Sequence, residues 1–192
     1  MSEKPRRADA ERNIAAIHEA ALTVLSDRPD ASIGQIADAA GVTRQTVYAH
    51  YGSREALLGA VADRALGEAV AAIDAAAPED GAPSEALERL VAAWWGSVER
   101  HARVLEALAT AFPDHDRVRE LHEPILERLE RLARRGQRSG DFDPDVAASW
   151  LATAFLALMH AAAEDVAAGR ASVGAAADAL ARSVPRLFAA TG

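Results

Sequence analysis

The chain has 192 residues, of which half are hydrophobic and 5% are aromatic, and its formal net charge is −8. This length allows a hydrophobic core and is in the size range of one or two domains. The absence of cysteine excludes disulfide bonds and thiolate metal sites and is compatible with a reducing cytoplasm. Abundant Ala, Leu, Arg and Glu, without the alternation typical of strands, predict an all-α protein.

The N-terminal segment, MSEKPRRADAERN, is charged and lacks the apolar core of a signal peptide, so we expect a cytoplasmic protein. Residues 1–64 contain 8 basic and 9 acidic residues, and the rest of the chain contains 13 and 20. The basic residues at the leading end are Lys4, Arg6, Arg7 and Arg12. Such a cluster attracts phosphate through its local potential, whatever the net charge; the alternative is a solvated tail. The acidic remainder predicts modest non-specific binding to DNA.

After a helix expected over residues 10–25, the segment SIGQIADAAGVTRQTVYAHYGSR, residues 32–54, has the pattern of two short helices joined at Gly41. Ser32 and Gln35 form the capping box that begins the first of these helices, and Thr43 is a suitable N-cap for the second. The apolar positions that would face each other across the turn are Ile36, Ala37, Ala40, Val42 and Val47.

This arrangement leaves Arg44, Gln45 and Thr46 exposed in the first turn of the second helix. Helix-turn-helix proteins read base edges in the major groove with these N-terminal positions. The spacing alone is equally compatible with an ordinary corner between two helices of a core.

The next residues distinguish the two interpretations. The segment VYAHYGSREALLGAV, residues 47–61, resembles the end of the recognition helix and the start of the next helix in the TetR family of transcriptional regulators. The resemblance covers roughly residues 10–65, about a third of the chain. Two positions depart from the family pattern: Arg54 stands where Lys is most frequent, and the loop of residues 27–30 lacks the usual glycine.

The resemblance implies an N-terminal three-helix DNA-binding domain, residues 1–54, and a C-terminal helical domain for effector binding and dimerisation, residues 55–192. It makes Arg44 and Gln45 the candidates for base contacts, since Arg pairs with guanine and Gln with adenine. The candidates for phosphate contacts are Thr43, Thr46, Tyr48, His50 and Arg54. Tyr51 is expected to pack inside the small domain. The alternatives are a solvated surface role for Arg44 and a core role for the ring of Tyr48.

Further helices are expected along the rest of the chain. Ser53 would begin one that runs to about Ala77, and Ser84 the next, with an apolar face up to Val98. A shorter helix over residues 104–112 would stop at Pro113, and another over residues 118–132 would be bent by Pro124. Asp143 and Pro144 have the pattern of an N-cap followed by proline at the first helical position.

Residues 146–163 carry no formal charge and approach the length of a membrane span. We do not expect one, because the stretch is mostly Ala and includes Ser149, Thr153 and His160. A helix from Ser172 has apolar residues in near-heptad spacing, at Val173, Ala177, Leu180, Val184 and Leu187. The resemblance implies that these two C-terminal helices form a four-helix homodimer interface; the alternative is that they close a monomeric core.

Effector binding is expected in the C-terminal domain. Trp94 and Trp95 lie about 100° apart on their helix, so that both cannot face the same way. One of them would line a cavity for a small, largely apolar ligand. The other candidates for this cavity are Phe112, His122, Trp150, Phe155 and Met159; each of these residues is also compatible with an ordinary core.

We expect neither an enzyme nor a metal site. Asp114, His115 and Asp116, with His122, are potential metal ligands, but the first three read as a turn between helices. The chain has no nucleophile motif, phosphate-binding glycine loop or His-Glu-x-x-His spacing. The sequence thus predicts a homodimeric transcriptional repressor that binds a palindromic operator and responds to a small-molecule effector. The alternatives are a helical adaptor and a helical metal- or small-molecule-binding protein without DNA activity.

Overall fold

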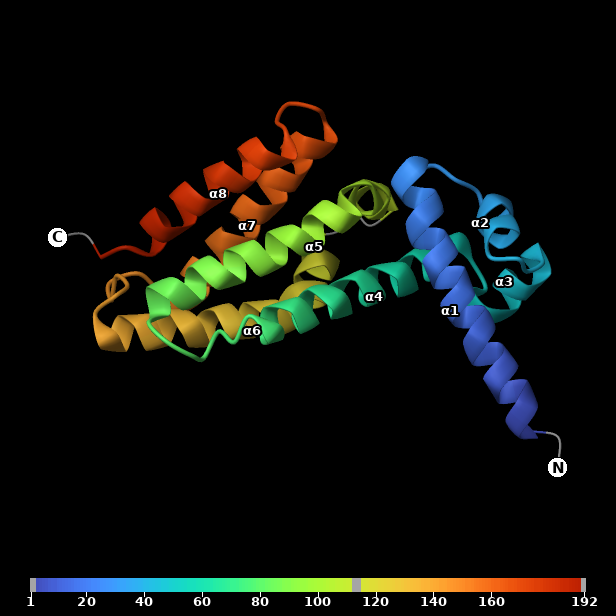
Figure 1. Cartoon of the computed structure of the whole chain (residues 1–192), viewed down its shortest axis with the longest axis horizontal. Coiled ribbons are helices and arrows are strands. Elements are labelled where there is room, and N and C mark those ends of the chain that lie inside the picture. Colours follow the sequence, from blue (N-terminus) through green and yellow to red (C-terminus); the bar gives the residue numbers. More distant parts are fainter. Residues whose placement is uncertain (1–2, 112–114, 191–192) are drawn as a thin grey trace. The chain divides into compact units, whose positions relative to one another are not determined.

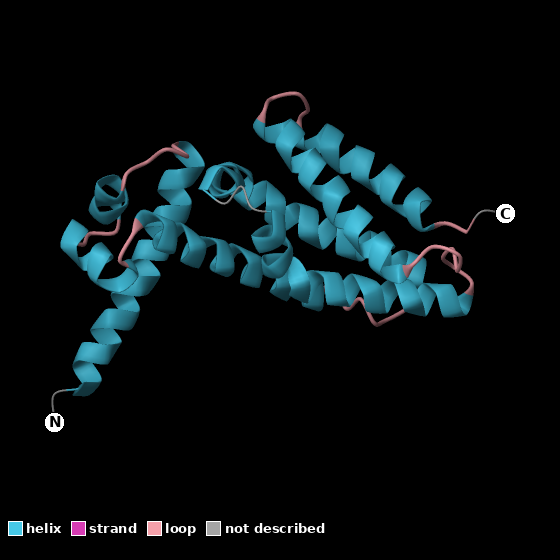
Figure 2. Ribbon diagram, turned by 180° about the vertical axis from the view of Figure 1, so that it is seen from behind, coloured by secondary structure: helices cyan, strands magenta, loops and turns pink. Residues whose placement is uncertain are grey.

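The computed structural model describes residues 3–111 and 115–190, and side chains within residues 9–98, 120 and 122–190. Helices joined by loops make up these ranges, and no strand is drawn in them (Figure 2). The helices are α1 (Glu3–Asp27), α2 (Ile33–Ala39), α3 (Arg44–Tyr51), α4 (Arg54–Ala75), α5 (Pro83–Ala111), α6 (His115–Ser139), α7 (Ala148–Ala167) and α8 (Val173–Phe188) (Figure 1). The predicted all-α fold is confirmed.

The chain divides into two compact units. The first contains Met1–Arg64 and Arg103–Pro113, and the second contains Ala65–Ala102 and Asp114–Gly192. Helix α4 contributes its first half to one unit and its second half to the other.

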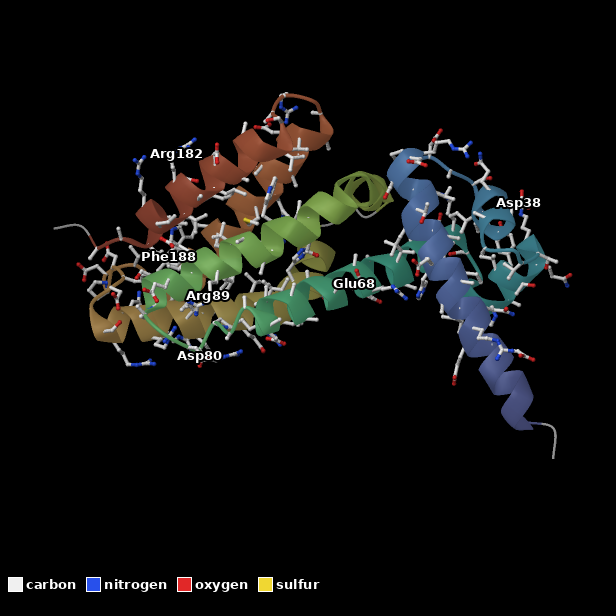
Figure 3. All side chains as sticks on the ribbon, viewed as in Figure 1. Asp38, Glu68, Asp80, Arg89, Arg182 and Phe188 are labelled. Carbon is white, nitrogen blue, oxygen red and sulfur yellow. The ribbon has the colours of Figure 1, made fainter. Side chains whose placement is uncertain are left out.

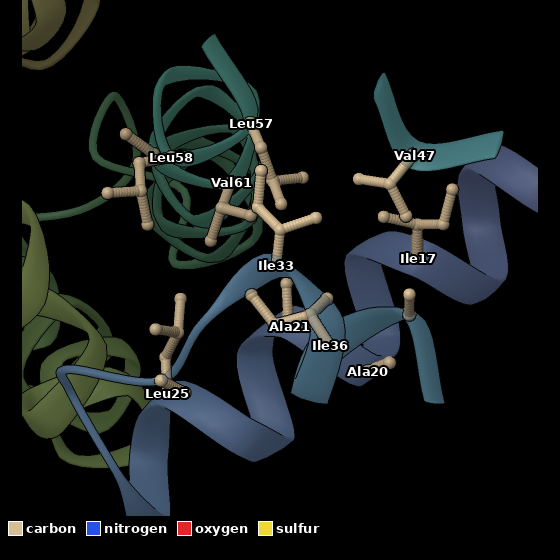
Figure 4. Close-up of a cluster of buried hydrophobic side chains, with 13 residues drawn as sticks. Ile17, Ala20, Ala21, Leu25, Ile33, Ile36, Val47, Leu57, Leu58 and Val61 are labelled. Carbon is tan, nitrogen blue, oxygen red and sulfur yellow. The ribbon is translucent and has the colours of Figure 1, made fainter. Parts of the chain in front are cut away.

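Apolar side chains from four helices form the core of the first unit (Figure 4). Ile36 and Ala37 of α2 and Val47 of α3 are fully buried, as the helix-turn-helix pattern predicts. They pack with apolar residues of α1 and α4, which are Ile17, Ala20, Ala21, Leu25, Leu57, Leu58, Val61 and Ala62. This core holds α3 by its inner face only and leaves its outer face uncovered.

Local signals begin and end the two short helices as predicted. The backbone N–H of Ser32 donates to Oε1 of Gln35 at 2.9 Å, and its hydroxyl accepts from the backbone N–H of Gln35, which completes the capping box. The hydroxyl of Thr43 accepts from the backbone N–H of Thr46 at 3.1 Å. Gly41 has a φ of +67° in the turn between α2 and α3, a conformation that a side chain would strain.

Helix α5 differs from the sequence prediction. It is a continuous helix of 29 residues over Pro83–Ala111, where we expected two helices separated near residues 99–103. That stretch reads ERHAR and lacks an apolar residue in register, but it also lacks glycine and proline. A gap in the apolar pattern does not terminate a helix when every residue in the gap tolerates helical conformation.

The predicted N-cap at Asp143 is wrong, because α7 begins later, at Ala148. The side chain of Asp143 instead accepts from the backbone N–H of Asp145 at 2.9 Å and forms a local turn. The amide of Gln137 donates to the carbonyl oxygens of Asp143 and Val146, at 2.8 and 2.7 Å. These carbonyl groups are therefore engaged by α6 rather than by a first turn of α7.

Arginine side chains hold the end of α4 in the second unit. Arg89 of α5 donates to the carbonyl oxygens of Ala76 and Asp80, at 3.0 and 2.7 Å (Figure 3). Arg128 of α6 forms a bidentate ion pair with the carboxylate of Asp74, with N···O distances of 2.6 and 2.8 Å. The carbonyl group of Ala76, just beyond the end of α4, thus has a cationic donor, as the helix dipole favours.

Helix α7 packs against α6 and α8 in the second unit. Four residues of α8 at intervals of four are buried: Ala176, Leu180, Val184 and Phe188. Among the described helices, none has both the length and the apolar character that a bilayer span requires.

Candidate functional site

The first turn of α3 is exposed. Thr43, Arg44 and Gln45 face solvent, and Thr46 is half-buried. Val47, the next residue, is fully buried and anchors the helix to the core of the first unit. The structure therefore places the predicted base-contacting residues on the free face of a short helix that is held by a single buried side.

Arg44 and Tyr48 lie one turn apart on this face and contact each other. Nη2 of Arg44 donates to the hydroxyl oxygen of Tyr48 at 3.2 Å, and its Cζ lies 5.4 Å from the centroid of the Tyr48 ring. The hydrogen bond to Tyr48 raises the pKa of Arg44 above its ordinary value. The guanidinium group is thus charged and held beside an aromatic ring in the free protein.

The threonine hydroxyls at the start of α3 form a pair. The Oγ1 atoms of Thr43 and Thr46 lie 2.8 Å apart, and Oγ1 of Thr43 also caps the helix. Since each hydroxyl has one hydrogen and the pair uses only one of them, the other can be donated to an acceptor such as a phosphate oxygen.

Arg54 has a different environment from the one expected. Its side chain is half-buried, and Nη2 donates to the carbonyl oxygens of Pro29 and Ala31, at 3.3 and 3.2 Å. These two residues belong to the loop between α1 and α2, whose geometry the sequence left open. Arg54 thus ties this loop to the start of α4.

The end of α3 is fixed by a hydrogen bond that the sequence did not indicate. The hydroxyl of Tyr51 lies 3.1 Å from Nε2 of His18 in α1, and the Tyr51 ring packs against the core. Burial raises the pKa of Tyr51, and burial together with the nearby charge of Arg64 lowers that of His18. His50 is exposed beside this pair, at the last turn of α3. The sequence did not identify His18 as a partner of Tyr51, because the two residues are 33 positions apart and no local pattern connects them.

The leading basic cluster is only partly described. Arg12 is exposed and forms an ion pair with Asp9, which offsets its charge. The side chains of Lys4, Arg6 and Arg7 lie outside the described residues.

The second unit contains an aromatic cluster built from α5, α6 and α7. The ring of Trp94 stacks on His122, with centroids 6.0 Å apart and planes 13° apart, and lies 5.4 Å from the ring of Phe155. His122 also contacts His160 edge to face, with the two Nε2 atoms 3.4 Å apart. The cluster therefore brings together Trp94, His122 and Phe155, which were predicted for effector binding, with one further histidine, His160.

His160 is neutral at pH 7. Burial, with a smaller contribution from His122, lowers its pKa from 6.5 to about 4. The sequence pattern did not identify its pairing with His122, which lies 38 residues earlier in the chain. A neutral imidazole in this position can donate or accept a hydrogen bond without adding a charge to the apolar core.

The other predicted effector residues have separate environments. Trp95 is 6% exposed, and among the described residues its buried Nε1 has no hydrogen-bond partner. Trp94 and Trp95 are both buried because α5 is covered on more than one side. Trp150 is 62% exposed, so it does not join the cluster around Trp94. Phe112 lies outside the described residues.

The potential metal ligands of residues 114–116 lie outside the part of the chain whose side chains are described. Within that part, no group of three or more His, Cys, Asp and Glu side chains is placed to hold a metal ion.

Comparison with known proteins addresses both units. Residues 17–61 match the family model of bacterial regulatory proteins of the tetR family, and residues 83–175 match that of the tetracyclin repressor-like C-terminal domain. The HTH-type transcriptional repressor LfrR of Mycolicibacterium smegmatis is 46% identical over 81 residues, which cover 42% of this chain and 43% of that protein. The HTH-type transcriptional regulator NfxB of Pseudomonas aeruginosa is 29% identical over 80% of this chain and 82% of its own.

A solved structure of LfrR from Mycobacterium smegmatis, in complex with proflavine, superposes with a TM-score of 0.63 and 28% identity. The superposition covers 94% of this chain and 99% of the LfrR chain. The two family models together match residues 17–61 and 83–175, and both curated relatives are named as HTH-type transcriptional regulators or repressors. The chain belongs to the TetR family and is a transcriptional regulator of the helix-turn-helix type.

Proposed function

We propose that the protein is a homodimeric repressor that binds a palindromic operator through α3 and is released by a small, largely apolar ligand. The observation that carries the proposal is the first turn of α3, which is capped by Thr43, anchored by the buried Val47 and exposed at Arg44 and Gln45. Such a helix can enter the major groove without rearrangement of its own unit. The proposed target is double-stranded DNA, and the proposed location is the cytoplasm.

In this proposal, Arg44 and Gln45 contact base edges, since their side chains can form two hydrogen bonds with guanine and with adenine. The paired hydroxyls of Thr43 and Thr46 and the exposed His50 contact phosphates and set the register of the helix. Arg54 acts by holding the loop between α1 and α2, because its guanidinium already donates to two loop carbonyls.

The proposed dimer uses the outer faces of α7 and α8. Trp150, Ala157 and Ala161 are exposed on α7, where spacings of seven and four place them on one side of the helix. On α8, Val173 and Leu187 are only half-buried, although the residues of the inner stripe are fully covered. A second copy related by a twofold axis would cover both faces and would present two α3 helices to a symmetric site. We therefore assign Trp150 to the subunit interface.

The proposed effector site is the cluster around Trp94 and His122. Aromatic faces with a few neutral polar groups suit planar, largely apolar compounds. The relative LfrR was solved in complex with proflavine, which supports a small-molecule effector here. Release requires that the ligand bind better to the form of the dimer that does not fit DNA.

Selection of bound duplexes from a random DNA pool tests the proposed function. The expected result is a twofold-symmetric motif whose half-sites lie about one duplex turn, or a multiple of it, apart. Light scattering of the purified protein should give twice the chain mass. A pool that is not enriched at low salt, or a motif without symmetry bound by a monomer, would contradict the proposal.

A further inference from the structure

The contact between Arg44 and Tyr48 is not enforced by packing. Both side chains are on the exposed face of α3, and 39% of Tyr48 is accessible to solvent. The guanidinium nevertheless lies against the ring and donates to its hydroxyl. The contact is therefore an interaction between these two side chains themselves, in the part of the molecule that would meet DNA.

A free arginine side chain samples many rotamers and loses them when it binds a base. The ring of Tyr48 has only two side-chain torsions, so it samples fewer conformations than the arginine side chain does. A guanidinium held by such a ring has fewer conformations to lose. Because less conformational entropy is lost on binding, its contact with a base is stronger and more dependent on the position of the acceptors.

The contact leaves the guanidinium able to recognise a base. An arginine side chain has five N–H donors, and the bond to Tyr48 uses one of those on Nη2. The remaining donors include a pair suited to the O6 and N7 acceptors of guanine. The hydroxyl of Tyr48 thus orients the guanidinium plane of Arg44 and leaves free the N–H donors that would contact guanine.

We propose that Tyr48 is a positioning residue that orients Arg44 and thereby sets the preference for guanine at one base pair of each half-site. The inference rests on the proposed function, in which α3 reads DNA. It assigns Tyr48 a role different from the phosphate contact that the family resemblance implies. A phosphate contact would change the affinity for every DNA sequence, whereas an orienting contact changes the preference among bases.

A double-mutant cycle separates the two roles. The variants are Tyr48→Phe, Arg44→Ala and the combination of both. Fluorescence anisotropy would give their dissociation constants for the selected operator, for operators with the guanine replaced, and for unrelated DNA. With Arg44 present, Tyr48→Phe should lower the preference for guanine about two- to fivefold, as expected for the loss of one hydrogen bond. With Arg44→Ala, the same change should have no effect on base preference.

Tyr51→Phe is a matched control, because it removes a hydroxyl from the same helix without touching Arg44. It breaks the hydrogen bond to His18, so it should lower the melting temperature of the protein and leave the base preference unchanged. Tyr48 is exposed, so its phenylalanine variant should melt like the wild type; circular dichroism would check this.

An equal loss of affinity for all DNA sequences with Tyr48→Phe would overturn the inference. An effect of Tyr48→Phe on base preference that persists in the Arg44→Ala background would also overturn it. A wild-type protein that binds no DNA would refute the proposed function itself. A wild-type protein that selects an operator but is insensitive to Tyr48→Phe would refute only the role of Tyr48.

Discussion

Gly136 lies in α6 directly against the ring of Phe142, where no side chain fits. A Cβ atom at this position would lie 2.1 Å from Cδ2 and 2.5 Å from Cε2 of the ring, far inside van der Waals contact. The ring has little room to move, because Phe142 is 3% exposed and packs edge to face against Phe188 of α8, with centroids 5.1 Å apart. The backbone of Phe142 also forms an isolated β-bridge with Ala189.

Gly136→Ala should therefore destabilise the protein, although alanine favours a helix over glycine by about 0.5–1 kcal/mol. Displacement of the ring costs part of the about 3–5 kcal/mol that complete loss of a buried phenylalanine would cost. The expected net loss in the free energy of unfolding is about 2 kcal/mol. Urea denaturation at a fixed protein concentration, followed by circular dichroism, measures this loss.

Gly67→Ala is the matched control, since Gly67 is exposed in α4 and a Cβ there has no neighbour within 4 Å. This variant should gain about 0.5–1 kcal/mol. Combining Gly136→Ala with Phe142→Leu should recover part of the loss, because the smaller side chain leaves room for the methyl group. If Gly136→Ala proves as stable as Gly67→Ala, the described packing of the Phe142 ring against Gly136 is wrong.

Three further substitutions test the proposed DNA contact, the buried His160 and the proposed subunit interface. Arg44→Ala should weaken operator binding by about 1–3 kcal/mol and relax one base position per half-site; an equal loss on all DNA in anisotropy titrations would contradict a base contact. The pKa of His160 is about 4 in the folded protein and near 6.5 when unfolded, so the unfolded state takes up a proton first as the pH falls. The free energy of unfolding should decrease between about pH 6.5 and pH 4, by up to about 3 kcal/mol in total. His160→Gln should remove this part of the dependence in urea titrations, and an unchanged difference between the two pH values would refute the assignment. If the proposed dimer forms, Trp150→Glu should reduce the mass in light scattering to that of one chain while circular dichroism still shows a helical protein; a persistent dimer would place the interface elsewhere.

Local sequence signals predicted the helix-turn-helix well because the residues that interact are close in the chain. The capping box joins Ser32 and Gln35, and Thr43 caps through Thr46; each pair is three residues apart. Gly41 lies in the turn with a positive φ, which is a property of the backbone itself. Such signals specify where a helix begins and ends without knowledge of the tertiary structure.

The remaining features depend on contacts between distant residues. Arg54 donates to loop carbonyls more than twenty residues away, and a sequence pattern cannot distinguish this role from a phosphate contact. The apparent N-cap at Asp143 is overridden by the amide of Gln137 and by the backbone of Phe188, which accepts from the N–H of Asp143. The exposure of Trp150 depends on the packing of the helices within the second unit.

The most direct test compares the wild type with an Arg44→Ala, Gln45→Ala variant in selection from the same random duplex pool at low salt. If the exposed first turn of α3 reads bases in both subunits, the wild type will enrich a twofold-symmetric motif and the variant will enrich none. Enrichment of the same motif by both proteins, or of no motif by the wild type, would show that this turn does not recognise DNA.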